Sequence, residues 1–265
     1  MDGPQAQKPL RILCFGDSLT AGYSAYGSMY HPYSEQLTER LKAAGYGGGV
    51  VEETTDGVPG DLTGMFMSRI LSHFGRDKGR QPYDWTIVLG GTNDLAYSFP
   101  PEQIFQNLEK TWNVALLNRS KVLALTVPEA AAKSEQLNKR RQRLNELINS
   151  YNRENFYVFD FHAALPYHSL SAEDREKYWD DHVHLTADGY DFMGEKIAEA
   201  LKGIMGDTGS SVVPATNGAT TDSSPKRPTR RRRVFKDDDN NFVEETGDPT
   251  LIDQGYIVVR RKDLD

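Results

Sequence analysis

The sequence predicts an α/β fold: a three-layer α/β/α sandwich with a parallel sheet of about five strands. Short apolar runs alternate with longer segments in which apolar residues recur at helical spacing. The short runs are mostly apolar, as expected for parallel strands that helices cover on both faces. The 265 residues, 38% of them hydrophobic, suffice for one sizeable core but not for two large domains.

Five runs are expected to form the strands: Leu10–Phe15, Val50–Glu53, Trp85–Leu89, Val122–Val127 and Tyr157–Phe159. Apolar residues about four positions apart predict the helices: Tyr33, Leu37 and Leu41; Leu62, Phe66, Ile70 and Phe74; Ile104, Leu108 and Trp112; Leu137, Leu144, Ile148 and Tyr151; Phe192, Ile197 and Leu201. In such folds, ligands bind beyond the carboxyl ends of the strands. Chemistry is therefore expected in the polar segments that directly follow the strands.

The composition changes near Met205, where a stretch rich in Gly, Ser, Thr, Pro and Asn begins. We expect a catalytic domain over residues 8–204 and a disordered tail over residues 205–265. In the tail, residues 226–233 contain six basic side chains, which indicates a nuclear-import signal, a contact with an acidic protein partner, or a solvated stretch balanced by Asp237–Asp239. Tyr256–Val259 could add a strand to a partner or pack on the domain.

The net charge of −7 disfavours nucleic-acid binding by the domain. The polar N-terminus lacks the apolar centre of a signal peptide, and no apolar stretch reaches the roughly 18 residues of a membrane span. The sequence therefore favours an intracellular protein, cytoplasmic or nuclear, with no membrane span. Cys14 is the single cysteine and lies within an apolar run, so we expect a buried, inert thiol and no internal disulfide.

Four polar segments occupy the positions where a site is expected: residues 16–20, 57–61 and 90–94, each after a strand, and 180–186 before the last helix. Ser18 lies where backbone N–H groups at a helix start can face an anion. Gly60 lets the backbone approach a ligand closely, and Asn93 offers a neutral N–H donor. Each segment taken alone is equally compatible with ordinary turn and capping chemistry.

The fourth segment contains an Asp and a His three residues apart, an arrangement in which the carboxylate can orient the imidazole. Acyl transfer to a serine needs such a base and such an anion. A metal site formed by Asp181, His182 and His184 is the alternative, but the chain has no His-Glu-x-x-His pattern and no second ligand cluster. We expect neither a metal nor a cofactor. The Gly-x-Ser-x-Gly motif of common α/β-hydrolases is absent.

Taken together and in this order, the four segments resemble the conserved blocks of the SGNH, or GDSL-type, hydrolase family. Gly-Asp-Ser-Leu at 16–19 resembles the first block and Gly-Thr-Asn-Asp at 91–94 the third, while Asp-His-Val-His at 181–184 contains the Asp-x-x-His of the last. The resemblance implies a flavodoxin-like SGNH hydrolase fold and a lipase-like serine esterase. The second block often carries an Asn shortly before its glycine, and here Thr55 and Asp56 occupy that region.

The resemblance also implies a role for each matched residue. Ser18 becomes the nucleophile, His184 its base and Asp181 the anion that orients the base. The N–H groups of Ser18 and Gly60 and the side-chain amide of Asn93 would form the oxyanion hole. The expected reaction is hydrolysis of small carboxylic esters, with short acyl or sugar acetyl groups, through an acyl-enzyme.

Two other functions remain open on the sequence: acyl transfer by the same residues, and a non-catalytic binding or regulatory protein that acts through its tail. The substrate is less defined than the chemistry. Tyr23, Tyr26, Tyr30 and Tyr33 follow the nucleophile and either line an acyl pocket or pack the first helix against the sheet. The short connections leave little chain for a lipase lid.

Overall fold

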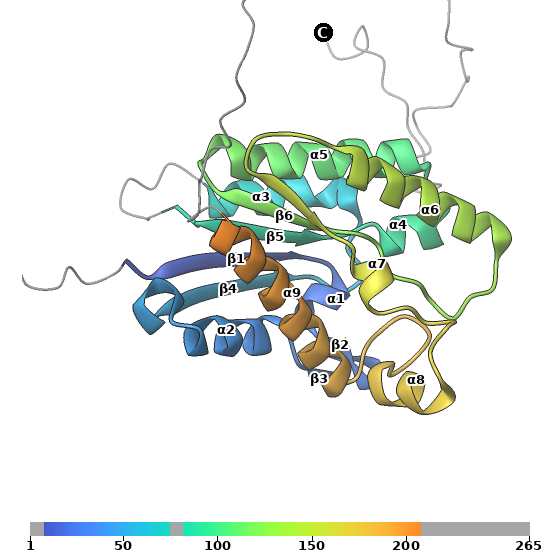
Figure 1. Cartoon of the computed structure of the whole chain (residues 1–265). Helices are drawn as coiled ribbons and strands as arrows, with labels where there is room; N and C mark the ends of the chain where they lie inside the picture. Colours follow the sequence, from blue (N-terminus) through green and yellow to red (C-terminus); the bar gives the residue numbers. More distant parts are fainter. Residues whose placement is uncertain (1–7, 75–81, 208–265) are drawn as a thin grey trace, which may run out of the picture. The chain divides into compact units, whose positions relative to one another are not determined.

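The structure, a computed structural model, describes residues 8–74 and 82–207. Its main sheet has five parallel strands in the spatial order β4-β1-β5-β6-β7 (Figure 1). This order places β5 at the centre between β1 and β6, as in other flavodoxin-like folds. The strands are β1 (Leu10–Gly16), β4 (Val51–Gly57), β5 (Trp85–Leu89), β6 (Lys121–Leu125) and β7 (Phe156–Phe159).

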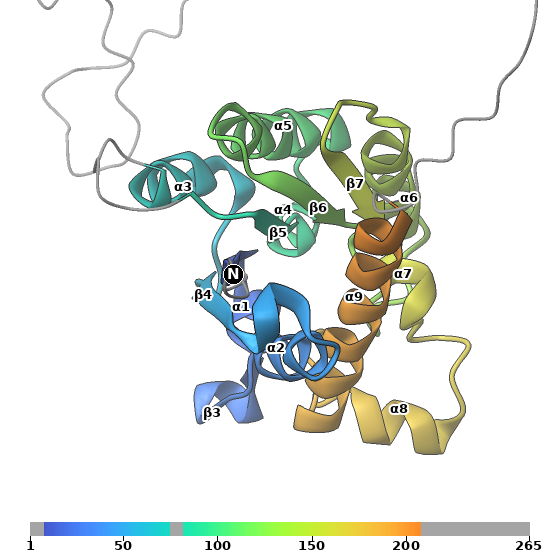
Figure 2. The same cartoon turned by 60° about the vertical axis from the view of Figure 1, so that its left-hand side comes forward.

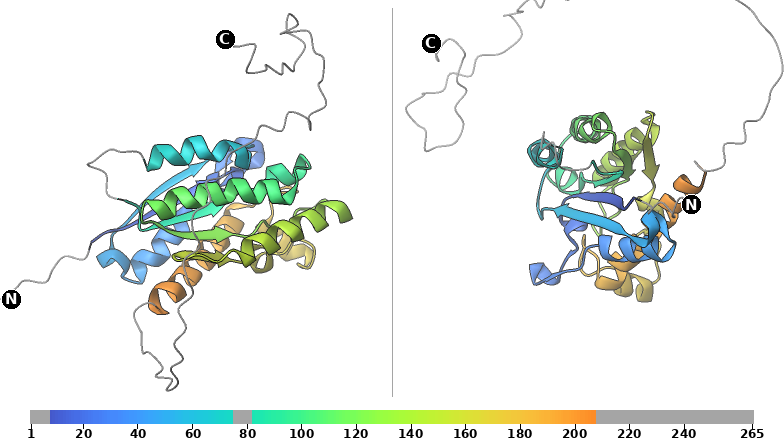
Figure 3. Two further views of the ribbon diagram at one scale, coloured as in Figure 1. Left: turned by 90° about the horizontal axis from the view of Figure 1, so that it is seen from above. Right: turned by 90° about the vertical axis from the view of Figure 1, so that its left-hand side faces the viewer.

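Helices cover both faces of this sheet. On one face lie α2 (Ser34–Ala43), α7 (Phe161–Ala164) and α9 (Ala187–Asp207), and on the other α3 (Phe66–His73), α5 (Pro101–Leu117) and α6 (Glu135–Ser150) (Figures 1 and 2). Seen from above, α3, α5 and α6 lie side by side over one face of the sheet (Figure 3). The predicted three-layer α/β fold is confirmed.

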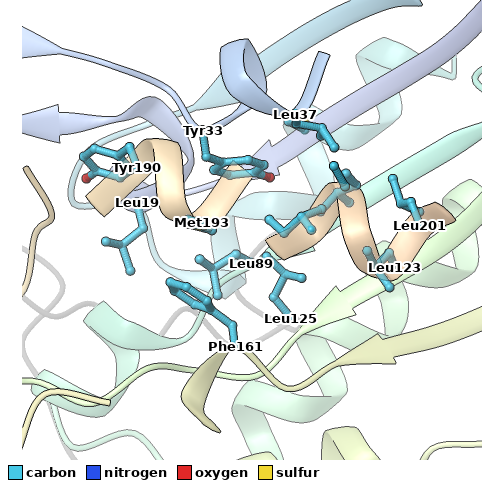
Figure 4. Close-up of a cluster of buried hydrophobic side chains, with 14 of the residues drawn as sticks. Leu19, Tyr33, Leu37, Leu89, Leu123, Leu125, Phe161, Tyr190, Met193 and Leu201 are labelled. Carbon is cyan, nitrogen blue, oxygen red and sulfur yellow. The ribbon is translucent and has the colours of Figure 1, made fainter. Parts of the chain in front are cut away.

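Each face has its own hydrophobic core because neighbouring strand residues point to opposite sides. In β1, Ile12 and Cys14 face α2 and α9, whereas Leu13 and Phe15 face α3. Figure 4 shows the first core, in which side chains of α9 meet those of the strands and of α2. Cys14 is fully buried, and burial raises the pKa of its thiol far above the usual range. It is therefore an inert core residue, as predicted.

The strand and helix boundaries differ from the expected ones where tertiary contacts decide them. β4 continues past Glu53 through a polar stretch to Gly57, because its backbone pairs with β1 along its whole length. The last helix continues to Asp207, beyond the expected domain end at residue 204, since Ile204 and Met205 pack against the core. The remainder of the expected tail, including residues 226–233 and Tyr256–Val259, lies outside the described residues.

Short elements gather near the carboxyl ends of the strands. The segment after β1 forms α1 (Ser18–Ala21) and then an antiparallel hairpin of β2 (Tyr23–Ser24) and β3 (Met29–Tyr30), joined by η1 (Ala25–Gly27). The other short elements there are η3 (Thr63–Met65), α4 (Thr92–Ala96) and α8 (Ala172–Tyr178). A further short element, η2 (Tyr46–Gly49), lies at the opposite end of the sheet, directly before β4. No described helix is long and apolar enough to cross a membrane.

Candidate active site

Ser18 is the first residue of α1, immediately beyond the end of β1. The Asp17 side chain caps this helix by accepting the Leu19 N–H at 3.0 Å. Gly16 makes the sharp turn possible, because a Cβ at this position would collide with the Leu89 carbonyl of β5. The first N–H groups of a helix have no partner within the helix. The turn therefore places both the Ser18 hydroxyl and its backbone N–H at the carboxyl end of β1.

His184 connects this serine to a carboxylate. The Ser18 Oγ lies 2.9 Å from His184 Nε2, and His184 Nδ1 lies 2.8 Å from Asp181 Oδ2. A proton on Nδ1 that is donated to Asp181 leaves Nε2 to accept the serine proton. The structure thus brings together three of the predicted site residues in one hydrogen-bonded chain.

The Asp181 carboxylate is held by the same loop that it orients. Its Oδ1 accepts the N–H groups of Val183 and His184, each at 2.6 Å. Partial burial opposes ionisation of Asp181, but these hydrogen bonds and the His184 ring outweigh it and lower the pKa of the carboxyl. Asp181 is therefore ionised at neutral pH and can stabilise a positive charge on the imidazole.

The two remaining predicted residues lie in neighbouring segments: Gly60 in the loop after β4 and Asn93 in α4. In the sheet register, Gly16 is opposite Gly57 of β4 and Leu89 of β5, so the segments after β1, β4 and β5 begin at the same level. Asn93 Nδ2 donates to the Asp61 carbonyl at 2.9 Å, which ties α4 to the loop that contains Gly60. An amide nitrogen has a second N–H, so Asn93 keeps one donor for a ligand.

The loop after β4 adopts a conformation suited to exposing backbone donors. Gly60 has φ +81°, a left-handed conformation that favours glycine. The Gly60 N–H donates no hydrogen bond within residues 8–74 and 82–207. A second link to α4 fixes the loop: the buried Asp94 carboxylate accepts both the N–H and the hydroxyl of Thr63.

Arg69 of α3 supports this loop, and sequence reasoning missed it. Its guanidinium donates to the Asp61 carboxylate at 2.9 Å, to Asp56, and to the Gly16 carbonyl at 2.7 Å. One side chain thereby joins the ends of β1 and β4 to the loop of Gly60. Asp56 lies in the region where the family pattern often carries an Asn, and here it pairs with Arg69. In the sequence, the only hint of this arrangement was the presence of two nearby carboxylates, Asp56 and Asp61.

Tyr23 is a second residue that the sequence placed only within a group of four tyrosines. Its ring centroid lies 4.6 Å from that of His184, with the planes tilted by 48°. The Tyr190 hydroxyl donates to the Tyr23 carbonyl at 2.8 Å and so anchors its backbone. The other tyrosines separate: Tyr33 is a buried core residue, whereas Tyr26 and Tyr30 are exposed on the hairpin. The packing interpretation therefore holds for Tyr33, and the acyl-pocket interpretation stays a prediction.

Asp180 and His182, which neighbour Asp181 and His184 in the sequence, have different surroundings. The Asp180 carboxylate accepts the Ala25 N–H at 2.7 Å and connects the loop to the hairpin. His182 is exposed and lines a separate cavity. In the described part of the chain, no three His, Cys, Asp or Glu side chains gather as ligands for a metal ion.

Comparison with known proteins agrees with the fold and with the four segments. The GDSL-like Lipase/Acylhydrolase family matches residues 14–192, which span every segment of the candidate site. The chain belongs to this family. A comparison with curated proteins gave no match.

Solved structures of GDSL-type proteins share the fold at low sequence identity. A lipase/acylhydrolase from Enterococcus faecalis has 22% identity and a TM-score of 0.58, with 74% of this chain and 96% of that chain covered. A carbohydrate acetylesterase from Sinorhizobium meliloti has 19% identity and a TM-score of 0.56, with 74% and 99% covered. A carbohydrate esterase family 3 structure from Talaromyces cellulolyticus has 15% identity and a TM-score of 0.55, with 75% and 99% covered.

Proposed function

We propose that this GDSL-type protein is a serine esterase that hydrolyses small carboxylic esters through an acyl-enzyme. The observation that carries the proposal is the hydrogen-bonded chain from Ser18 through His184 to Asp181. Its three members come from opposite ends of the domain sequence. A nucleophile, a base and an orienting anion connected in this way are the arrangement that nucleophilic acyl transfer requires.

In the first half-reaction, His184 Nε2 takes the Ser18 hydroxyl proton while Ser18 Oγ attacks the ester carbonyl carbon. The tetrahedral intermediate collapses, the bond to the leaving oxygen breaks, and the His184 imidazolium gives its proton to the departing alcohol. In the second half-reaction, His184 removes a proton from water, which attacks the acyl-Ser18 carbonyl. The carboxylic acid leaves, and Ser18 regains its proton from His184.

The negative charge on the carbonyl oxygen would be held by three donors: the Ser18 N–H, the Gly60 N–H and the Asn93 amide. The position of Ser18 at a helix start, the left-handed Gly60 and the link from Asn93 to the Asp61 carbonyl support this assignment. Fixed donors of this kind contribute because they need no reorganisation when the charge develops.

The proposed substrates are esters with short acyl groups or acetyl groups on sugars. The segment after Ser18 supports this assignment, since α1 is followed by the short hairpin Tyr23–Tyr30 and not by a long covering segment. The Sinorhizobium and Talaromyces proteins, which share the fold, are named as carbohydrate esterases and motivate the sugar-acetyl candidates.

The test compares the Ser18→Ala variant with wild type on p-nitrophenyl acetate. We expect turnover to fall to background while circular dichroism and thermal unfolding stay those of a folded protein. Ser68→Ala is the matched control, because Ser68 is exposed on α3 and donates only to the Met65 carbonyl. Retained turnover in Ser18→Ala would contradict the proposal.

A panel of acyl chain lengths and sugar acetates then defines the substrate. Added alcohols in the same assay distinguish hydrolysis from acyl transfer. Formation of a new ester in place of the free acid would identify an acyltransferase.

A further inference from the structure

A cavity of about 480 Å³ opens beside the candidate active site, on the side of β6 and β7. Its walls come from the segment after β6 and the start of α6, from the loop after α7, from α8, and from the loop that contains Asp181 and His184. The lining residues are Ala131, Lys133, Asn138, Tyr167, His168, Arg175 and His182. None of the steps proposed for ester hydrolysis uses these side chains.

The lining is rich in cations that lack a carboxylate partner. Within residues 8–74 and 82–207, neither Lys133 nor Arg175 forms an ion pair. The Arg175 guanidinium donates to the carbonyls of Tyr167 and Leu170 and lies 5.1 Å above the Tyr167 ring. These contacts fix its position without neutralising its charge. His168 adds a buried Nε2 that has no hydrogen-bond partner among the described residues.

A third cation lies behind the wall of the cavity. Arg141 is only 5% exposed, and its guanidinium donates to Asn138 Oδ1, which belongs to a lining residue. Its Nε is buried and has no hydrogen-bond partner in the part of the chain that the structure describes. A buried cation that lacks an ion pair is costly unless another anion compensates it. Arg141 therefore adds to the positive potential of the cavity.

Glu129 is the acidic group that opposes this potential. Its Oε2 accepts the N–H groups of Tyr167 at 2.8 Å and of His168 at 2.9 Å, and these hydrogen bonds hold the pKa of the carboxyl low despite its partial burial. The carboxylate is thus engaged in fixing the loop of Tyr167 and His168. Among the lining residues and the two groups behind them, the cations Lys133, Arg175 and Arg141 outnumber the engaged carboxylate Glu129, so this cluster carries a net positive charge.

The loop that contains the candidate base His184 forms one wall of the cavity. The Ala131 N–H donates to the His182 carbonyl at 2.9 Å, and His182 stands between Asp181 and His184 in the sequence. A ligand group in the cavity would therefore lie next to the loop that holds the imidazole. We propose that the cavity binds an anionic group, a carboxylate or a phosphate, on the ester that Ser18 attacks. This inference rests on the proposed esterase function.

The kinetic test uses two p-nitrophenyl esters of the same chain length, the neutral hexanoate and the anionic monoester of adipic acid. The measured quantity is the ratio of kcat/KM for the anionic ester to that for the neutral ester. Lys133→Gln should lower this ratio about tenfold, which corresponds to about 1.4 kcal/mol. Lys139→Gln is the matched control, because Lys139 is a nearby lysine on α6 that does not line the cavity and is paired with Glu135. It should leave the ratio at the wild-type value.

The binding test separates the cavity from catalysis. Inorganic phosphate and adipate are titrated separately into the Ser18→Ala protein and into Ser18→Ala with Lys133→Gln, by calorimetry at low salt. We expect saturable binding that Lys133→Gln weakens, and the tighter ligand identifies the preferred anion. If wild type hydrolyses neither ester, the esterase proposal fails and this titration alone decides the cavity.

Two results would overturn the inference. One is an equal kinetic ratio in wild type, Lys133→Gln and Lys139→Gln, which would exclude a substrate subsite even if free anions bind. The other is the absence of phosphate and adipate binding to Ser18→Ala.

Discussion

The Tyr23 ring lies against the His184 imidazole, with centroids 4.6 Å apart, and restricts the orientation of the candidate base. Because His184 must also accept a hydrogen bond from Ser18, a small rotation of the imidazole would lengthen the path of the proton. Tyr23 is thus a positioning residue that acts through His184.

Tyr23→Ala should lower kcat severalfold, since aromatic contacts of this kind contribute about 0.5–1.5 kcal/mol. Tyr23→Phe should retain the wild-type kcat, because the contact uses the ring and the anchoring hydrogen bond uses the backbone carbonyl. Steady-state kinetics that separate kcat from KM provide the test. Equal losses in Phe and Ala would contradict a role for ring packing.

Asp181→Asn should lower kcat by about 10⁴, the effect known when an orienting carboxylate becomes an amide. The amide can no longer stabilise the charged imidazole. Asp180→Asn is the neighbouring control, since Asp180 contacts the Ala25 N–H and not the ring. If both variants lose the same activity, the effect comes from the loop and not from the carboxylate of Asp181.

The same carboxylate makes stability depend on pH at the acid end. The pKa of Asp181 is lowered in the folded protein, so its contribution is present above its unfolded value of about 4 and is lost as pH falls through the folded value. Thermal unfolding of wild type should therefore lose more stability than that of Asp181→Asn as the pH is lowered below about 4. Parallel curves for the two proteins would contradict this linkage.

Asp17 gives the opposite dependence. Burial raises the pKa of the Asp17 carboxyl to about 7, and the nearby carboxylate of Asp94 acts in the same direction. Among the described residues, Asp17 Oδ2 has no hydrogen-bond partner. Between its unfolded value of about 4 and its folded value, the folded state binds the proton more tightly, so stability is lost as pH rises. Asp17→Asn removes this titration. Its free energy of unfolding relative to wild type should be higher at pH 8 than at pH 5 in denaturant titrations, and an equal difference at both pH values would refute the assignment.

Asn93→Ala should lower kcat by about 10²–10³ with a smaller change in KM, as expected for a donor that acts on the developing oxyanion. The substitution also removes the hydrogen bond to the Asp61 carbonyl. Thr63→Val is the control for this link, because it loosens the same loop through Asp94 without removing the amide donor. A similar kcat loss in Thr63→Val would assign the effect to the loop.

The sequence was most informative where a single physical pattern decides the structure. The buried strand Trp85–Leu89 is apolar at every position except Thr86, and its predicted bounds agree with those observed. The edge strand β4 is polar over its second half, and its length depends on pairing with β1, which no local pattern reveals. The helix α8 was missed because it buries none of its residues and so lacks an apolar face.

The candidate site shows the same division. Ser18, Asp181 and His184 could be selected because their short polar segments lie at expected strand or helix ends and together resemble the blocks of the family. Arg69 and Tyr23 could not, because their roles depend on tertiary contacts with segments elsewhere in the chain. The cationic cavity was missed for this reason as well, since its lining residues come from separate loops.

Covalent labelling tests the central proposal most directly. The full-length protein is treated with a fluorophosphonate, which reacts with activated serines, and the modified residue is located by mass spectrometry. The proposal predicts one adduct on Ser18 that is absent from Ser18→Ala and strongly reduced in His184→Ala. A folded protein that remains unlabelled, or that is labelled at another serine, would contradict it.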